Sequence, residues 1–139
     1  MDAVKKVIGH YERDFKKRKT IFLGIYLKKE KNKLVGIADI FDFNYIVNSL
    51  EVGYRINENY WGKGIATKAT AMMIDFLFNV IEVNRIQATP MPINKKSQNV
   101  LKKNGFIYEG TLRQVKQWTG TGIVDLTSYS ILKSEYKKV

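Results

Sequence analysis

The sequence predicts an α/β (α+β) fold, with a mixed and mostly antiparallel central sheet flanked by helices. Three observations predict it. β-rich runs joined by short turns fill much of the first half of the chain, two segments with helical periodicity follow, and further β-rich runs lie between and after them. The 139 residues, of which 45% are hydrophobic, suffice for one well-buried core, so we expect a single domain over residues 1–139.

The first part of the chain is expected to contain a helix and then a hairpin. Apolar residues recur at helical spacing after Asp2, a suitable N-cap, and they are Val4, Val7, Ile8, Tyr11 and Phe15. The β-rich runs Ile21 to Leu27 and Leu34 to Phe41 flank a charged turn in which Asn32 suits a positive φ. They predict an antiparallel hairpin, and Leu50 to Ile56 predicts a third strand.

Helices and strands are expected to alternate in the second half. A helix is predicted over Ile65 to Ile81, and its apolar face consists of Ala66, Ala69, Met73, Phe76, Leu77 and Val80. We also expect Met72 and Phe78 to join the core. Arg85 to Ala88 is typical of a short buried strand.

The remaining elements are a second helix and two closing strands. The helix is expected from about Lys96 to Lys103 and ends at Asn104-Gly105, because glycine readily takes the left-handed conformation that follows a helix. The strands are predicted over Phe106 to Leu112 and Ile123 to Leu132. The loop expected between them contains Trp118, Gly120 and Gly122.

Composition and charge exclude several classes of protein. The chain has no cysteine, which excludes a disulfide scaffold, thiolate zinc sites and a cysteine nucleophile, and we expect no metal site. The N-terminal residues lack the apolar segment of a signal peptide, so we expect a cytoplasmic protein that does not enter a membrane. The net charge of +11 would attract an anionic partner. The basic residues are dispersed and accompany no nucleic-acid-binding motif, which favours a phosphorylated cofactor over nucleic acid.

A glycine-rich turn precedes the first long helix after the hairpin. Its sequence is Trp61-Gly62-Lys63-Gly64-Ile65-Ala66-Thr67. Small residues let backbone N–H groups approach an anion, and a helix N-terminus adds partial positive charge, so phosphate is the expected ligand. The spacing matches neither a P-loop nor the Rossmann fingerprint, and glycine spacing alone fits a turn that binds nothing equally well.

Four segments together are more specific than the glycine turn. In order and spacing they resemble the GNAT acetyltransferases, in particular the Rim-type enzymes that acetylate ribosomal-protein N-termini, and they are Leu50 to Ile56, Tyr60 to Ala69, Asn94 to Ser97 and Lys103 to Phe106. The resemblance extends from about Leu34 to Tyr136. Family members carry another strand and helix before the point where this chain begins. This difference leaves open a shortened pocket, an incomplete chain, or replacement of the element by a partner chain.

The resemblance implies that acetyl-CoA is the co-substrate and lies where the strand containing Tyr54 to Ile56 separates from the strand containing Arg85 to Ala88. The pyrophosphate would be held by backbone amides of Gly62, Lys63, Gly64, Ile65, Ala66 and Thr67. The backbone of Arg55 and Ile56 would contact the pantetheine and the thioester, where an N–H group could stabilise the oxyanion. Trp61 stands where the wider family often has Gln or Arg, but it fits the Rim-type branch.

Candidate catalytic residues also follow from the resemblance. Glu51 lies on the strand where some family members place a carboxylate that removes the amine proton through water. Asn94 could bind the pantetheine amide and Ser97 could protonate the leaving thiolate, although both residues also suit a helix cap. The family's usual tyrosine acid is replaced by Leu101. His10 lies away from every motif, and we expect it on the surface or in packing.

These features predict an N-acetyltransferase that moves acetyl from acetyl-CoA to a primary amine by direct attack in a ternary complex. A protein or peptide N-terminus is preferred over a small amine, because a cationic enzyme repels polyamines at long range. The alternatives are a small-molecule amine acetyltransferase and a non-catalytic CoA-binding or interaction module. A homodimer also stays open, since a missing sheet element would expose an edge that a second chain could cover.

Overall fold

The computed structural model describes residues 20–136, and these open with the expected hairpin. β1 (Ile21–Leu27) pairs antiparallel with β2 (Lys33–Asn44), and the short 3₁₀ turn η1 (Lys28–Glu30) connects them. Asn32 has a φ of 59°, which confirms the left-handed conformation expected there. The helix predicted before the hairpin, with His10, lies outside the described residues.

The sheet is mixed and mostly antiparallel, as the sequence predicts. The other strands are β3 (Ser49–Ile56), β4 (Arg85–Ala88), β5 (Ile107–Trp118) and β6 (Gly122–Leu132), and the spatial order is β1-β2-β3-β4-β6-β5. Within residues 20–136 the only parallel pair is β3 with β4. The predicted bounds of β4 are confirmed, and β3 begins one residue earlier than expected.

The parallel pair is short, and this creates a gap in the sheet. β3 and β4 are in register only from Ser49 opposite Arg85 to Glu51 opposite Gln87. β3 then continues to Ile56, paired with β2 alone, while β4 ends at Ala88. Within residues 20–136, the edge of β3 that faces β4 therefore has no strand partner beyond Glu51.

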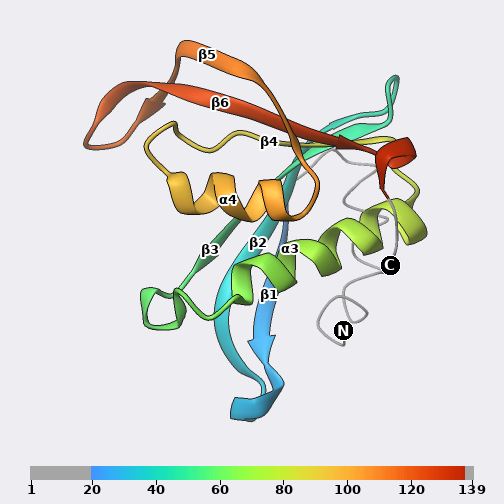
Figure 1. Ribbon diagram of the computed structural model, residues 1–139, viewed down its shortest axis with the longest axis vertical. Coiled ribbons are helices and arrows are strands. Elements are labelled where there is room, and N and C mark those ends of the chain that lie inside the picture. Colours follow the sequence, from blue (N-terminus) through green and yellow to red (C-terminus); the bar gives the residue numbers. More distant parts are fainter. Residues whose placement is uncertain (1–19, 137–139) are drawn as a thin grey trace.

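Two helices, α3 (Ile65–Phe76) and α4 (Lys95–Lys103), lie against the same face of the sheet (Figure 1). One apolar cluster unites this face with the helices. It includes alternate strand residues together with helix residues, among them Ala38, Ile40, Leu50, Val52, Ile86, Met73, Ile74 and Leu101. The alternation follows from the two-residue period of a strand, and it leaves Glu51, Gly53 and Arg55 on the opposite face.

The first long helix does not continue as α-helix to Ile81. Residues Leu77–Ile81 form a π-helical turn, η3, and this wider turn shifts the side-chain register. Phe78 is consequently fully buried, whereas Val80 is 55% exposed, so its placement on the apolar face was wrong. Met72, expected in the core, is 40% exposed.

The closing hairpin is longer than predicted. β5 extends to Trp118 instead of ending at Leu112, and Trp118 therefore belongs to a strand rather than a loop. Bulges explain the error, because they break the alternation by which a strand is recognised. At one of them Gln114 takes a φ of 49°, and its N–H donates to Asp125 Oδ1 at 2.7 Å.

Candidate active site

The glycine turn leads directly into the N-terminus of α3. Gly62 and Gly64 have φ values of 75° and 77°, a left-handed conformation that favours glycine. A Cβ atom added to either glycine would meet nothing within 4 Å, so the backbone conformation and not crowding explains the residue type. The first helical hydrogen bond joins the Lys68 N–H to the Gly64 carbonyl at 3.1 Å. The N–H groups of the first helical turn thus precede any helical acceptor and suit an anion.

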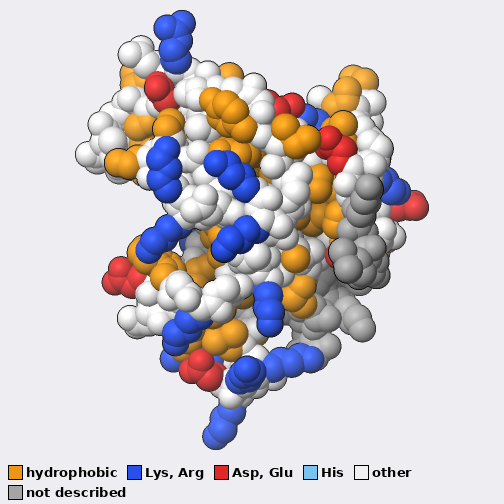
Figure 2. Space-filling model, in the orientation of Figure 1, with side chains coloured by type: hydrophobic (Ala, Val, Ile, Leu, Met, Phe, Trp, Pro, Cys, Tyr) orange, Lys and Arg blue, Asp and Glu red, His pale blue; other side chains and the backbone are white. Residues whose placement is uncertain are grey.

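A pocket of about 880 Å³ lies between the end of β3, the glycine turn and α4. It brings together most residues that the sequence singled out for binding and chemistry, namely Arg55, Ile56, Trp61, Gly62, Gly64, Ile65, Ala66, Thr67, Asn94 and Ser97. Lys95, Lys96 and Lys103 add positive charge. Figure 2 shows the molecule hollowed on its left side, with basic side chains above and below the hollow.

Two residues predicted for the site are not among those lining this pocket. The Lys63 ammonium lies 5.4 Å from the centroid of the Tyr60 ring. Glu51 lies at the last position of β3 that pairs with β4, and its side chain lies on the face of the sheet opposite the helices. Glu51 is therefore separate from the predicted residues that line the pocket.

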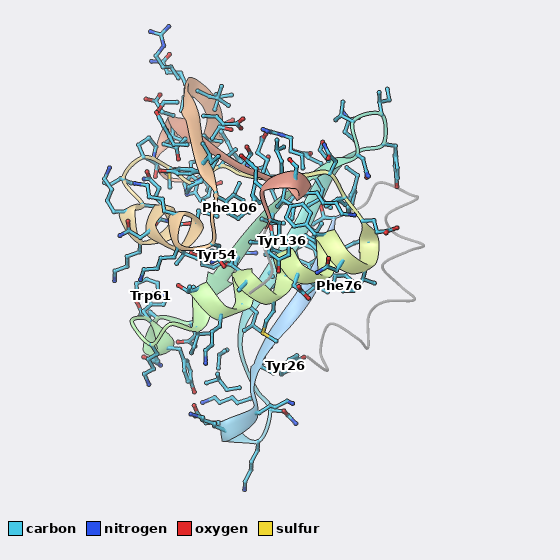
Figure 3. The ribbon with its side chains drawn as sticks, turned by 45° about the vertical axis from the view of Figure 1, so that its right-hand side comes forward. Tyr26, Tyr54, Trp61, Phe76, Phe106 and Tyr136 are labelled. Carbon is cyan, nitrogen blue, oxygen red and sulfur yellow. The ribbon has the colours of Figure 1, made fainter. Side chains whose placement is uncertain are left out.

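Trp61 connects the glycine turn to the end of β3 by a hydrogen bond. Its indole Nε1 donates to the Ile56 carbonyl at 2.7 Å, and the Lys96 ammonium lies 5.1 Å from its ring centroid. The backbone of Ile56 is predicted to contact pantetheine, and its carbonyl thus already accepts a hydrogen bond within the protein. Trp61 lies at the outer end of the site, beside the start of α3 (Figure 3).

Asn94 caps α4, and Ser97 does not. Asn94 Oδ1 accepts a hydrogen bond from the Ser97 backbone N–H at 3.1 Å, which is the standard N-cap contact. Ser97 instead lines the pocket, as does Tyr54. Leu101, at the family's usual tyrosine position, is buried in the core and carries no proton to donate.

Glu51 is half-buried and accepts hydrogen bonds from two donors, Gln87 in β4 and Thr89 immediately after it. Gln87 Nε2 donates to Glu51 Oε1 at 3.2 Å, and Thr89 Oγ1 donates to Glu51 Oε2 at 2.5 Å. Burial raises the pKa of Glu51, and the nearby Asp42 adds to the rise, while the hydrogen bonds from Thr89 and Gln87 and the charge of Lys116 oppose it. A carboxylate with a raised pKa is a better proton acceptor than an exposed one.

Sequence reasoning missed the residues that support Glu51. Arg85 forms a bidentate pair with Glu109, at 2.7 and 3.1 Å, and also donates to Gln87 Oε1 at 2.8 Å. These contacts orient Gln87 toward Glu51. Their sequence signal is weak, because Gln87 and Thr89 become neighbours of Glu51 only through the pairing of β3 with β4.

The position of α4 depends on a buried amide. Gln98 Nε2 donates to the Pro92 carbonyl at 2.8 Å, and Gln98 Oε1 accepts from the Tyr129 hydroxyl at 2.8 Å. At the far end of the helix, Asn104 Nδ2 donates to the Thr67 carbonyl at 3.2 Å. These bonds fix the pocket wall formed by α4 relative to β6 and to the start of α3.

Two kinds of feature are absent from residues 20–136. This part of the chain holds no group of three or more His, Cys, Asp or Glu side chains suited to a metal ion. It also contains no helix long and apolar enough to cross a membrane.

Comparison with known proteins agrees with this geometry. A family model described as acetyltransferase (GNAT) domain matches residues 1–107. The uncharacterized N-acetyltransferase p20 of Bacillus licheniformis is 33% identical over 108 residues, which cover 78% of this chain and 60% of p20. The spermidine N(1)-acetyltransferase of Escherichia coli K12 is 29% identical over 77 residues, which cover 55% of this chain and 41% of that protein.

Solved structures share the fold. Mycobacterium smegmatis RimJ, in complex with CoA-disulfide, matches with a TM-score of 0.82 and 26% identity, over 97% of this chain and 63% of that one. The ribosomal-protein-S5-alanine acetyltransferase of Vibrio fischeri matches with a TM-score of 0.79 and 25% identity, over 97% of this chain and 73% of that one. The chain thus spans less than two thirds of the length of p20 and of RimJ.

Proposed function

The chain belongs to the GNAT acetyltransferase family, and from this premise we propose that it transfers acetyl from acetyl-CoA to a primary amine. The observation that carries the proposal is the gap between β3 and β4, which has a basic pocket on one side and Glu51 on the other. Such an arrangement lets a thioester and an amine approach the same point from opposite faces of the sheet.

The residues of the pocket fit CoA. The N–H groups at the start of α3 and the left-handed glycines suit a pyrophosphate, and Lys96 and Lys103 suit further phosphate charge. The unpaired edge of β3 beyond Glu51 offers backbone groups to an amide-rich chain such as pantetheine. An N–H group on the same edge would stabilise the oxyanion that forms as the amine attacks.

On the other face, Glu51 would accept the proton that the amine loses, directly or through water. The attacking nitrogen forms a bond to the acetyl carbon, and the carbon–sulfur bond breaks with its electron pair on sulfur. Ser97, which lines the pocket, would protonate that sulfur. Attack is direct in this scheme, without an acyl-enzyme.

We favour a peptide or protein N-terminus as the acceptor. An α-amine with a pKa of about 8 is roughly a tenth neutral at pH 7, whereas a lysine amine near 10.4 is below about 0.1% neutral. A half-buried carboxylate reached through water is then sufficient for an α-amine. The net charge of +11 also disfavours long-range attraction of polyamines. The relatives with known acceptors include both a ribosomal-protein alanine and a spermidine acetyltransferase, so both acceptor classes enter the test.

The test is acetyl-CoA turnover with four acceptors, read by CoA release and by mass spectrometry of the product. The acceptors are a peptide with a free N-terminus and no lysine, the same peptide blocked at its N-terminus and carrying one lysine, spermidine, and an aminoglycoside. We expect the first peptide to be acetylated fastest. CoA binding by calorimetry without any acetylated product would instead support a non-catalytic CoA-binding module.

A further inference from the structure

A chain of side-chain hydrogen bonds crosses the sheet and ends at Glu51. Arg85 Nη2 donates to Gln87 Oε1 at 2.8 Å, and Gln87 Nε2 donates to Glu51 Oε1 at 3.2 Å. Arg85 also donates to both carboxylate oxygens of Glu109, at 2.7 and 3.1 Å. Because β6 lies between β4 and β5, the chain of contacts extends from β5 past β6 to β4 and β3.

The strand register explains why these side chains meet. Gln87 is directly opposite Glu51 in the pairing of β4 with β3, and Arg85 precedes Gln87 by two residues and so lies on the same face of β4. The side chains of Arg85 and Glu109 are 27% and 40% exposed. Their paired hydrogen bonds fix the plane of the guanidinium, which therefore stays beside Gln87.

The amide of Gln87 lies between a group that only donates and a group that only accepts. A guanidinium has five N–H donors and no acceptor, whereas an ionised carboxylate has only acceptors. Rotation of the amide by 180° would place its oxygen against Glu51 and its NH₂ group against Arg85, so both contacts would become unfavourable. Arg85 thus leaves the amide one favourable orientation, in which Gln87 donates to Glu51.

This orientation bears on the strength of Glu51 as a base. A hydrogen bond donated to a carboxylate stabilises its ionised form. Burial and the charge of Asp42 in β2 raise the pKa of Glu51, whereas the hydrogen bonds from Thr89 and Gln87 lower it, as does the charge of Lys116 in β5. Each carboxylate oxygen has one of these two donors. The orientation of Gln87 therefore decides whether the second donor is present.

We propose that Arg85 is a positioning residue for acetyl transfer, which fixes the amide of Gln87 so that this amide donates to Glu51. The assignment rests on the role of Glu51 as the base in the function proposed above. Arg85 acts on Glu51 through the amide of Gln87. It keeps the carboxylate ionised to lower pH and so widens the pH range over which Glu51 accepts a proton from the amine.

The test measures the pKa of Glu51 and, in parallel, the acidic limb of the single-turnover rate at saturating acetyl-CoA. NMR titration reports the pKa from the side-chain carboxyl carbon, whose signal is assigned by its loss in Glu51→Gln. The variants are Arg85→Met, Arg85→Lys, Gln87→Met and the double variant with methionine at both positions. Arg113→Met controls for the loss of one positive charge, at an exposed position of β5.

Arg85→Met frees the amide to rotate. We expect the pKa of Glu51 and the acidic limb to rise by about one unit, the size expected for loss of one hydrogen bond to a charged group. Arg85→Lys keeps a group that only donates, so its pKa should stay close to that of the parent. The double variant should shift no further than Gln87→Met alone, because no amide is left to orient. Arg113→Met should match the parent.

A parent-like pKa of Glu51 in Arg85→Met would overturn the assignment. So would a double variant in which the two single shifts add, because Arg85 would then act through its own charge. If Arg85→Met does not fold, Arg85→Gln takes its place. Its amide can donate or accept, so a smaller rise supports the assignment and no rise overturns it.

The two readouts separate this inference from the proposed function. A pKa of Glu51 that rises in Arg85→Met while the acidic limb stays in place would support the orientation of Gln87 by Arg85 and overturn Glu51 as the base. A parent protein that binds CoA but acetylates no acceptor would overturn the acetyltransferase proposal, and with it the part of Arg85 in acetyl transfer.

Discussion

Thr89 donates a hydrogen bond of 2.5 Å to Glu51 across the point at which β3 and β4 separate. The contact joins the last position of β3 that pairs with β4 to the residue that follows the end of β4. It stabilises the ionised carboxylate and so opposes the effect of burial on the pKa of Glu51. The balance between these two effects sets the pH at which Glu51 becomes a base.

Thr89→Val should therefore move the pH dependence of catalysis. The change keeps the shape of the side chain and removes the hydroxyl, so the pKa of Glu51 should rise further above its ordinary value. We expect the acidic limb of the single-turnover rate to shift to higher pH, with little change in the plateau. Thr111→Val, an exposed hydroxyl on β5, is the control and should leave the limb in place. If the acidic limb of Thr89→Val did not shift, the protonation of Glu51 would not control the rate of acetyl transfer.

Glu51→Gln should lower turnover with little loss of CoA affinity, since the side chain lies on the face opposite the pocket. The loss should be larger for a lysine acceptor than for an N-terminal α-amine, because the lysine amine more often carries the proton that must be removed. The measurement is steady-state turnover with both acceptors across pH. Equal rates for mutant and parent at every pH would return Glu51 to a structural role.

Glu51→Gln should also change how the stability of the protein depends on pH. The pKa of Glu51 is raised in the folded protein, so the folded state favours the protonated form. The contribution of Glu51 to the free energy of unfolding therefore falls as pH rises from the ordinary glutamate pKa through the raised one. Gln cannot ionise. The midpoint of thermal unfolding of Glu51→Gln, relative to the parent, should therefore increase between pH 4 and pH 8. A relative midpoint that falls over this range would contradict the direction of the pKa shift.

Much of the sheet could be predicted from sequence, because its signals are local. Alternating β-rich runs, the turn at Asn32 and the helix end at Gly105 each depend on a few adjacent residues, and the structure has Gly105 at a φ of 87°. Local signals failed where a π-turn or a bulge breaks the period, as at Val80 and in β5 beyond Leu112.

The residues of the candidate site likewise fall into those with a local sequence signal and those without one. The roles of the glycine turn and of Asn94 could be predicted, because each follows from the backbone conformation at the start of a helix. The roles of Gln87 and Thr89 could not be predicted, since both residues bond to Glu51, which is 36 to 38 positions away in the chain. No period or turn signal reports such a contact. Only the register of β3 with β4 brings these side chains together.

Gly64 gives a direct test of the turn. An added Cβ at Gly64 would meet no neighbour, so the effect of Gly64→Ala comes from the φ of 77° that alanine would have to adopt. This backbone strain should lower stability by about 1–2 kcal/mol and disturb the start of α3. Gly64→Asn is the matched variant, since Asn tolerates the left-handed conformation. We expect CoA affinity and thermal stability to fall in the Ala variant and to be largely kept in the Asn variant. CoA affinity of Gly64→Ala equal to that of the parent would exclude the turn as the pyrophosphate site.

Asn94 combines a cap with a position on the pocket, and two substitutions separate these roles. Asn94→Ala removes the acceptor for the Ser97 N–H and should cost about 1 kcal/mol of stability. Asn94→Asp keeps an acceptor, so stability should be retained, but its negative charge would oppose the phosphates and weaken CoA binding. Chemical denaturation and calorimetry measure the two quantities on one preparation. Parent-like CoA affinity in the Asp variant would show that Asn94 is a cap alone.

The last prediction uses the two tryptophans to locate CoA. Trp61 lines the pocket, and its indole N–H donates to the Ile56 carbonyl. Trp118 is the last residue of β5 and does not line the pocket. The Lys116 ammonium lies 5.8 Å from the centroid of the Trp118 ring. CoA bound along the glycine turn would exclude water from Trp61, so titration with CoA should change its fluorescence. Trp118→Phe should keep this change and Trp61→Phe should lose it. Trp61→Phe retains a ring for the Lys96 ammonium but loses the hydrogen bond to the Ile56 carbonyl, which should cost on the order of 1 kcal/mol of stability. If Trp118→Phe abolished the change and Trp61→Phe preserved it, CoA would lie near the β5–β6 hairpin and not in the pocket.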